Sequence, residues 1–202
     1  MFAFVAESDF FLHHMPFMTS TFSIALVSLF AALVAVLGLI PKIDLLLGVP
    51  ITMQTFGVML TGCLLGPKRG LQALLLFMAA VALGLPLLSG GRGGLAPFFA
   101  PASGYLMAWP LGAFVAGWVM VLIPTNTPRQ SAIAAFVASV VGGLLVVHVC
   151  GVVGLVNIAN LSWEQAIWGT LVFVPGDLIK CILTATVVHT VARGLPDWQL
   201  GR

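Results

Sequence analysis

Long apolar runs fill this chain from residue 19 onward, and the first of them, residues 19–40, contains no charged side chain. A helix that crosses the hydrocarbon core of a bilayer needs about 20 mostly apolar residues, so runs of this length favour membrane-spanning helices. We therefore expect an all-α integral membrane protein, a single transmembrane domain over 1–202 with six spans at about 19–40, 48–66, 71–88, 104–123, 131–159 and 175–193.

The charge content supports lipid as the main solvent. Only 7% of the 202 residues are charged, against about 25% in a soluble domain, and 60% are hydrophobic. Water would drive so apolar a surface to aggregate. The net charge of +2 is too small for nucleic-acid binding, which needs a clustered basic face. Composition therefore implies a lipid bilayer as partner and no nucleic acid.

Signals for a short separate helix precede the sixth span. Ser162 and Gln165 have the spacing of a capping box and would start a helix that runs to about residue 173. Pro175 favours the first turn of a new helix, because its missing N–H needs no partner there. We expect a short interfacial helix and then the sixth span. A single kinked helix over residues 163–193 is the alternative.

The placement of lysine and arginine predicts the orientation. With six spans, one set of loops and the C-terminal tail hold Lys68, Arg69, Arg129, Arg193 and Arg202. The opposite loops hold only Lys42 and Arg92. Cytoplasmic loops carry the excess of positive charge, so we expect both termini in the cytoplasm.

Asp177 and Lys180 are the two charges that we expect inside a span. A charged side chain in the bilayer costs at least ~2.5–3.5 kcal/mol on insertion scales and therefore points to function. Their spacing of three residues places them on one helix face, where they can pair. The pair is either structural or binds a polar solute that enters from outside. Because structural ion pairs can often be replaced by apolar residues, we favour solute binding.

The loop of residues 89–94 begins at Ser89 and holds four glycines around Arg92. Glycines allow a close backbone approach and expose N–H groups to a ligand, and an arginine fork can grip a carboxylate with two hydrogen bonds. A flexible loop with a solvated charge is the alternative. Arg92, Lys180 and Asp177 together carry one net positive charge, which would complement a solute with one negative charge.

Three further polar side chains lie in the apolar runs. Gln54 and Tyr105 are either ligand contacts or helix–helix hydrogen bonds. For His148 we predict core packing, because no second histidine or carboxylate lies at metal-ligand spacing in its span. The three cysteines lie far apart without a CxxC spacing, which indicates packing and neither a disulfide nor a metal site.

The sequence contains no GxxxxGK[ST], HExxH or GxSxG motif. Active uptake would therefore draw its energy from a partner or from a gradient. In the first span, Ser28-x-x-x-Ala32 and Ala31-x-x-x-Ala35 fit the small-xxx-small pattern that lets helices approach closely. Ala31, Ala32 and Ala35 would form a docking face for another membrane subunit, or else pack within the chain.

Several blocks carry a more specific signal: VPITMQTF at 49–56, LGPKRG at 65–70, GLP at 84–86, the glycine pair at 90–91, GYL at 104–106 and PGDLIK at 175–180. In these blocks the chain resembles the BioY family, the biotin-binding S components of energy-coupling-factor transporters. The resemblance implies a six-helix protein of a prokaryotic inner membrane that captures biotin from outside. It also implies a transmembrane coupling subunit and cytoplasmic ATPase subunits that use ATP, so no cofactor is expected in this chain.

The resemblance places biotin binding on Asp177 and Lys180, and extends it to Ser89 and Arg92 of the loop after the third span. A carboxylate can accept an N–H of the ureido ring of biotin, and an ammonium can donate to its carbonyl. Two alternatives have other mechanisms. The chain would be a self-sufficient secondary carrier with a proton site at Asp177, or a membrane-embedded enzyme, for which one Asp–Lys pair gives little support.

Overall fold

The computed structural model describes residues 16–43, 49–196 and 198. Over this part of the chain every regular element is helical, beside two isolated bridges, Ile43–Ile51 and Leu88–Arg92. The elements are α2 (Pro16–Leu37), α3 (Gln54–Ala82), the 3-10 turn η1 (Ala96–Phe98), α4 (Ser103–Leu122), α5 (Pro128–Ala138), the π-helix η2 (Ser139–Val146), α6 (Val147–Ile158), α7 (Trp163–Leu171) and α8 (Val174–Gly194). The all-helical prediction is confirmed.

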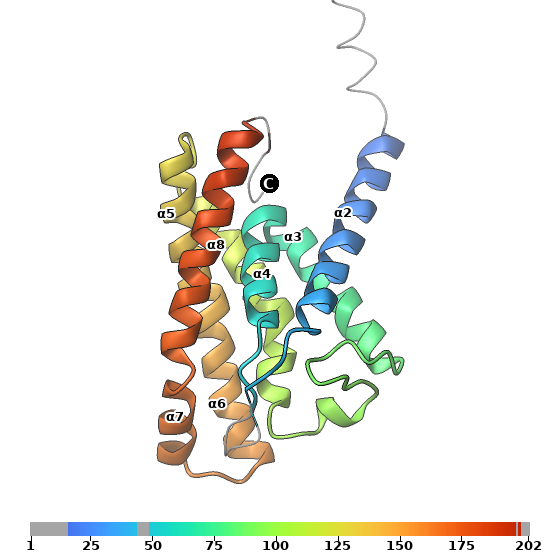
Figure 1. Cartoon of the computed structure of the whole chain (residues 1–202), viewed down its shortest axis with the longest axis vertical. Coiled ribbons are helices and arrows are strands. Elements are labelled where there is room, and N and C mark those ends of the chain that lie inside the picture. The colour runs from blue at the N-terminus through green and yellow to red at the C-terminus, as the bar shows by residue number, and fades with distance from the viewer. Residues whose placement is uncertain (1–15, 44–48, 197, 199–202) are drawn as a thin grey trace, which may run out of the picture.

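Four helical stretches of the described chain are long and apolar enough to cross a bilayer: Gln54–Ala82, Ser103–Leu122, Pro128–Ile158 and Val174–Gly194. The described part of α2 adds a shorter apolar segment, Thr21–Leu37. The helices form an elongated bundle in which α3 packs against α2 and α4, α4 against α6, and α5 against α8. In Figure 1 the first turns of α2 and the last turns of α8 lie at the same end, and α7 lies at the other.

The chain reverses direction inside α3, at Gly66. Gly66 has φ 81° and ψ −177°, a conformation that only glycine adopts readily, and Pro67 follows it. A Cβ atom built on Gly70 would lie 3.3 Å from the Cα atom of Gly62. Eight residues of continuous helix would separate them by about 12 Å. The segments before and after Gly66 therefore run back along each other, as the charged turn at Lys68 and Arg69 in the sequence indicates.

Both segments of α3 are shorter than the spans that the sequence predicts. The first helical residue is Gln54, and residue 48 lies outside the described residues. Residues 49–53 are not helical, and Ile51 forms the bridge to Ile43. The second segment ends at Ala82 rather than residue 88. Gly84, with φ 102°, ends this helix, and Pro86 follows two residues later.

The predicted fifth span consists of α5, η2 and α6. It begins three residues early, at Pro128, because Thr127 caps α5 through a capping box with Gln130. The π-helical turns of η2 bring glycines against neighbouring helices: a Cβ atom on Gly143 would lie 2.2 Å from Cγ of Met59. The wider π turns change which residues of α6 face the bundle.

The segment before α8 forms a separate helix. Ser162 and Gln165 make the predicted capping box at the start of α7, with hydrogen bonds of 3.2 and 3.0 Å. Val172 and Phe173 form a turn, and Pro175 lies in the first turn of α8. Two helices are therefore present, and the alternative of a single kinked helix is not.

The three alanines of α2 do not share one face. Ala31 is buried in the contact with α3, whereas Ala32 is exposed and Ala35 is half-buried. Neighbouring residues in a helix point about 100° apart, so Ala31 and Ala32 cannot lie in the same contact. Of the two small-residue patterns, Ser28-x-x-x-Ala32 is exposed.

Candidate functional site

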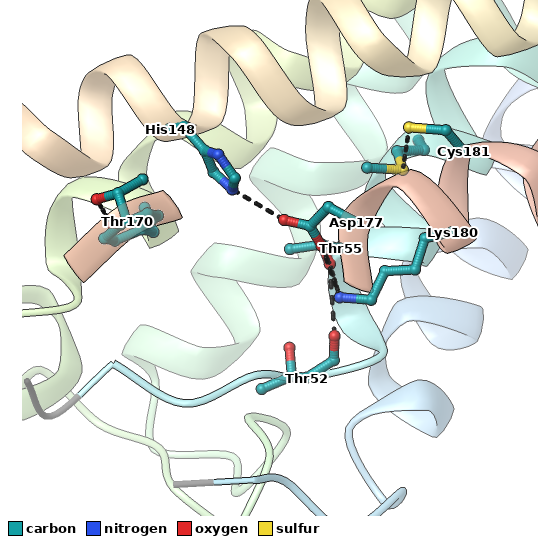
Figure 2. A network of polar contacts seen from close by, with 9 residues as sticks. Thr52, Thr55, His148, Thr170, Asp177, Lys180 and Cys181 are labelled. Carbon is teal, nitrogen blue, oxygen red and sulfur yellow. Dashed lines mark hydrogen bonds and ion pairs between the residues drawn. The ribbon is translucent and has the colours of Figure 1, made fainter. Parts of the chain in front are cut away.

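Asp177 and Lys180 form an ion pair on the first two turns of α8. Lys180 Nζ lies 2.8 Å from Asp177 Oδ1, and the two residues are only 5% and 4% exposed. Figure 2 shows that both side chains point into a polar network between α8, α6 and α3. The i,i+3 pairing expected from the sequence is therefore present, and the burial means that each charge depends on the other.

His148 belongs to this network, so the prediction that it only packs in the core is wrong. Its Nε2 atom lies 2.8 Å from Asp177 Oδ2 (Figure 2). The two residues are 29 positions apart and on different helices. His148 is the second residue after η2, so the π-helical turns help to set the direction in which its ring points.

Thr55, from the first turn of α3, completes the network. Lys180 Nζ donates to Thr55 Oγ1 over 2.8 Å, and Thr55 Oγ1 lies 3.4 Å from Asp177 Oδ1. An ammonium has three N–H donors and a carboxylate about four acceptor positions. Lys180 therefore has one donor without a partner among the described residues. Asp177 Oδ2 accepts only from His148 there, so both partners of the ion pair can still bond a ligand.

A pocket opens beside the network and encloses about 660 Å³ of space, part of it open to solvent. Thr55, His148, Asp177 and Lys180 all line it. Its other walls are mostly apolar and include Val49, Pro50, Ile51, Leu88, Pro97, Leu106, Trp109, Val147 and Phe173. An apolar pocket with a few converging polar groups is the usual form of a small-molecule site.

Arg92 also lines this pocket, from the loop after α3. The loop folds tightly, because Leu88 and Arg92 exchange backbone hydrogen bonds of 3.0 and 3.2 Å around the intervening turn. Gly90 has φ 81°, a left-handed conformation that side chains other than glycine rarely adopt, so glycine is favoured in the turn. Arg92 Nε donates to the carbonyl of Ser89 over 3.3 Å, which holds the guanidinium close to its own loop.

Gln54 lines the pocket as well, but its amide is already engaged within the chain. Nε2 donates to the carbonyls of Val34 on α2 and of Leu87, both at 3.1 Å. Oε1 accepts the N–H of Ser89 over 3.0 Å. Ser89 is buried behind the lining and also donates its hydroxyl to the carbonyl of Ile40. Gln54 and Ser89 therefore join α2, α3 and the Arg92 loop.

Tyr105 makes a helix–helix hydrogen bond, one of the two roles that the sequence left open. Its hydroxyl lies 2.6 Å from Thr170 Oγ1 on α7, and Thr170 donates to the carbonyl of Ala166, so Tyr105 is the donor. The ring meets His148 edge-on at 6.2 Å and packs 5.9 Å from Phe173. Tyr105 thus provides an aromatic wall and supports His148.

The structure brings five of the six expected site residues to one pocket: Gln54, Arg92, Tyr105, Asp177 and Lys180. It also adds residues that sequence reasoning missed. Thr55 lies in the VPITMQTF block beside Gln54. The signal for His148 was a histidine in the middle of one span together with a single carboxylate, Asp177, inside another. Trp109 lines the pocket too, and its buried indole N–H has no hydrogen-bond partner among the described residues.

The helices and the pocket define a class of protein: an all-helical membrane protein that encloses a small-molecule-sized pocket with an ion pair in its wall. A family model described as the BioY family matches residues 12–197. The chain therefore belongs to the BioY family.

Relatives and a solved structure agree with this assignment. The chain is 41% identical to the biotin transporter BioY of Rhizobium etli, over 88% of this chain and 96% of the relative. It is 43% identical to the biotin transporter BioY of Rhodobacter capsulatus, over 89% of this chain and 98% of the relative. The crystal structure of an S-component for biotin from an ECF-type ABC transporter superposes with a TM-score of 0.79 at 31% identity, covering 89% of this chain and 95% of that one.

Proposed function

We propose that this chain is the substrate-capture subunit of a biotin uptake transporter. The observation that carries the proposal is the buried Asp177–Lys180–His148 network, which lies in the wall of an apolar pocket. The choice of biotin rests on the relatives, which are named biotin transporters, and on the solved S-component for biotin. These relatives are transporters and not enzymes, which sets the enzyme alternative aside.

The chemistry of biotin matches the groups that the pocket offers. Asp177 Oδ2 would accept a ureido N–H, and the third N–H of Lys180 would donate to the ureido carbonyl. The thioether ring and the aliphatic chain of biotin would lie against apolar walls such as Trp109 and Phe173. Arg92 would pair with the single carboxylate. Gln54, Ser89 and Tyr105 would shape the pocket, because their polar groups already bond within the chain.

The membrane arrangement is part of the proposal. We expect six crossings in the inner membrane, made by α2, the two segments of α3 on either side of Gly66, α4, the α5–η2–α6 stretch and α8, with α7 at the outer interface. The excess of lysine and arginine favours cytoplasmic termini. Lys68, Arg69, Arg129 and Arg193 lie in the described part of the chain, whereas Arg202 and residues 1–15 lie outside it.

Cysteine labelling tests this orientation. A cysteine at the exposed Leu95 should react with an impermeant thiol reagent from outside intact cells, whereas one at the exposed Gln130 should not. Gly93 is a poorer position for the label, since a Cβ atom there would lie 2.3 Å from the carbonyl oxygen of Leu85. The reverse labelling pattern would overturn the assigned orientation.

Energy would come from partner subunits, a transmembrane coupling subunit and cytoplasmic ATPases. The structurally similar S-component comes from an ECF-type ABC transporter, and this chain contains no P-loop.

The exposed stripe of Leu29, Ala32 and Val36 on α2 is the proposed docking face, because the small side chain of Ala32 allows close helix contact. Ala32→Trp should keep biotin binding and lose co-purification with the partners. Retained co-purification would refute this face.

The central experiment is binding of labelled biotin by the purified chain, followed by uptake into vesicles. We expect the chain to bind biotin but not to accumulate it in vesicles that lack an ATPase. Biotin should accumulate once the partner subunits and ATP are added. Accumulation by the chain alone would establish the secondary-carrier alternative. No binding of biotin to the folded chain would overturn the proposed function.

A further inference from the structure

Trp109 is a buried tryptophan in the wall of the biotin pocket. It lies on α4, is only 6% exposed and lines the pocket. Its Nε1 atom is buried and has no acceptor in the part of the chain that the structure describes. An indole N–H can only donate, and a buried donor without an acceptor is destabilising. The wall of the pocket therefore contains a donor that a ligand can satisfy.

The other four tryptophans of the chain are placed differently. Trp198 is partly buried, but its Nε1 donates to the carbonyl of Leu64 over 3.3 Å. The remaining three are exposed at the surface of the bundle: Trp118, Trp163 and Trp168. A buried indole N–H without a partner is therefore particular to Trp109, the tryptophan that lines the pocket.

The aromatic neighbour of Trp109 does not take up this N–H. Phe77, on the second segment of α3, lies with its ring centroid 6.0 Å from that of Trp109, and the two ring planes are 34° apart. An indole N–H lies in the plane of its ring. It can point into the face of a neighbouring ring only when the two planes are close to perpendicular. Phe77 therefore packs against the indole and holds it in place without accepting its hydrogen.

The helices α4 and α8 run in the same direction along the pocket. Residues 125–128, which follow α4, and residues 192–198, at the end of α8, line one hollow, so the ends of both helices are adjacent. The first turns of both helices therefore lie toward the opposite end, where the loop that carries Arg92 leads into α4. Residues further along either helix lie farther from this loop.

Trp109 and Lys180 lie at a similar depth in the pocket. The ring of Tyr105 is 6.2 Å from that of His148, and His148 bonds Asp177 over 2.8 Å, so these three residues mark one level. Trp109 follows Tyr105 by four residues, and Lys180 follows Asp177 by three. At 1.5 Å per residue, both lie about 5–6 Å beyond this level. The indole N–H therefore belongs to the same end of the pocket as the ammonium.

We propose that the N–H of Trp109 donates to the ureido carbonyl oxygen of bound biotin, as a second donor beside Lys180; this inference rests on the proposed biotin binding. A carbonyl oxygen has two lone pairs and can accept both bonds. The ureido N–H groups are donors and cannot pair with an indole N–H. The carboxylate, which would pair with Arg92, lies at the other end of biotin. Trp109 thus selects ligands with a strong acceptor at this position.

Trp109→Phe tests this contact, because it keeps an aromatic ring in the wall and removes the N–H. Binding of biotin should weaken about five-fold, since one neutral hydrogen bond is lost. Biotin methyl ester should lose affinity by the same factor, because the ester differs only at the carboxyl end. The analogue 2-thiobiotin, in which sulfur replaces the ureido oxygen, should lose less, because sulfur is a weak acceptor.

Trp118→Phe is the matched control. It makes the same change on the same helix, at an exposed position outside the pocket, and should leave the affinities for all three ligands unchanged. Equal losses of biotin and 2-thiobiotin in Trp109→Phe would mean that the indole only packs, and would overturn the inference. A greater loss for biotin than for its ester would place the N–H at the carboxylate and also overturn it, as would unchanged affinity in a folded variant.

The indole N–H signals of the wild-type chain, labelled with ¹⁵N at tryptophan, report the bond directly by NMR. Biotin should shift the Trp109 proton signal downfield, and 2-thiobiotin should shift it less. The signal is assigned from the Trp109→Phe variant or, if that variant does not fold, by elimination from the other four Trp→Phe variants. Bound biotin with an unmoved Trp109 signal would overturn this inference alone. No binding of biotin by the wild-type chain would overturn the proposed function itself.

Discussion

Replacing Asp177 with asparagine removes one negative charge from the ion-pair network and keeps the size of the side chain. In the structure this carboxylate accepts two hydrogen bonds of 2.8 Å, from Lys180 and from His148. A hydrogen bond that involves a charged group contributes ~1.5–3 kcal/mol, against ~0.5–1.5 kcal/mol for a neutral one. A bound ureido N–H would therefore lose about 1–1.5 kcal/mol at this position.

We thus expect Asp177→Asn to weaken biotin binding about five- to twelve-fold, which corresponds to the loss of about 1–1.5 kcal/mol. The assay is equilibrium binding of labelled biotin to the purified chain, with the thermal unfolding midpoint measured on the same preparation. Glu164→Gln is the matched control, because it makes the same carboxylate-to-amide change at an exposed position on α7, outside the pocket. Unchanged affinity in a folded Asp177→Asn variant would refute the reasoning.

A double variant separates binding from stability. Asp177→Asn leaves the Lys180 ammonium buried without its counter-charge, which is destabilising by itself. Adding Lys180→Met removes that buried charge and should return the unfolding midpoint toward the wild-type value. Biotin affinity should stay low, since both ligand contacts are gone. If affinity returned together with stability, the pair would have a structural role only.

Two further substitutions probe the other polar groups of the pocket. His148→Phe removes the donor to Asp177 Oδ2 and should cost roughly 1 kcal/mol, about five-fold in biotin affinity; an unchanged affinity would return His148 to a packing role. Arg92→Gln should weaken binding of biotin about ten-fold and that of biotin methyl ester much less, because the ester lacks the carboxylate charge. Equal losses for both ligands would place the carboxylate elsewhere.

Local sequence patterns predicted the elements whose causes are local. The capping box at Ser162, Pro175 at the start of α8 and the i,i+3 spacing of Asp177 and Lys180 all depend on residues within one or two helical turns. The charged turn after Gly66 also separates the two segments of α3 at the expected place. These features follow from backbone geometry, which a short stretch of sequence determines.

The parts that sequence reasoning missed depend on contacts between distant segments. His148 meets Asp177 across 29 residues, and no spacing rule on its own helix could reveal this. The π-helix that precedes it has ordinary apolar residues, so the hydrophobic period did not distinguish it from an α-helix. Ala31 and Ala32 fit small-residue patterns equally well, and only the packing of α2 on α3 decides which of them is exposed.

Two adjacent residues at the start of α3 connect the pocket to α2. Thr55 bonds Lys180 in the pocket, while Gln54 holds the carbonyl of Val34 on α2. A ligand that bonds Lys180 therefore contacts a group that is linked, through Thr55 and the adjacent Gln54, to α2, the helix that carries the proposed docking face. If the position of α2 differs between two conformations of the chain, biotin can shift the equilibrium between them only through contacts that differ between the two. The hydrogen bond from Gln54 to the carbonyl of Val34 is a contact that can differ in this way.

We expect co-purification of the partner subunits with the wild-type chain to depend on biotin, and Gln54→Met to remove most of that dependence. The methionine keeps the bulk of the side chain but cannot donate to Val34 or accept from Ser89. Biotin should still bind, because the ion pair and Arg92 are unchanged. The measurement is a pull-down with and without biotin, beside a binding assay on the same preparation. If the variant kept the full biotin dependence, or if the wild type showed none, residues 54 and 55 would have a structural role only. Biotin binding in the pocket would then not act on the docking face of α2 through them.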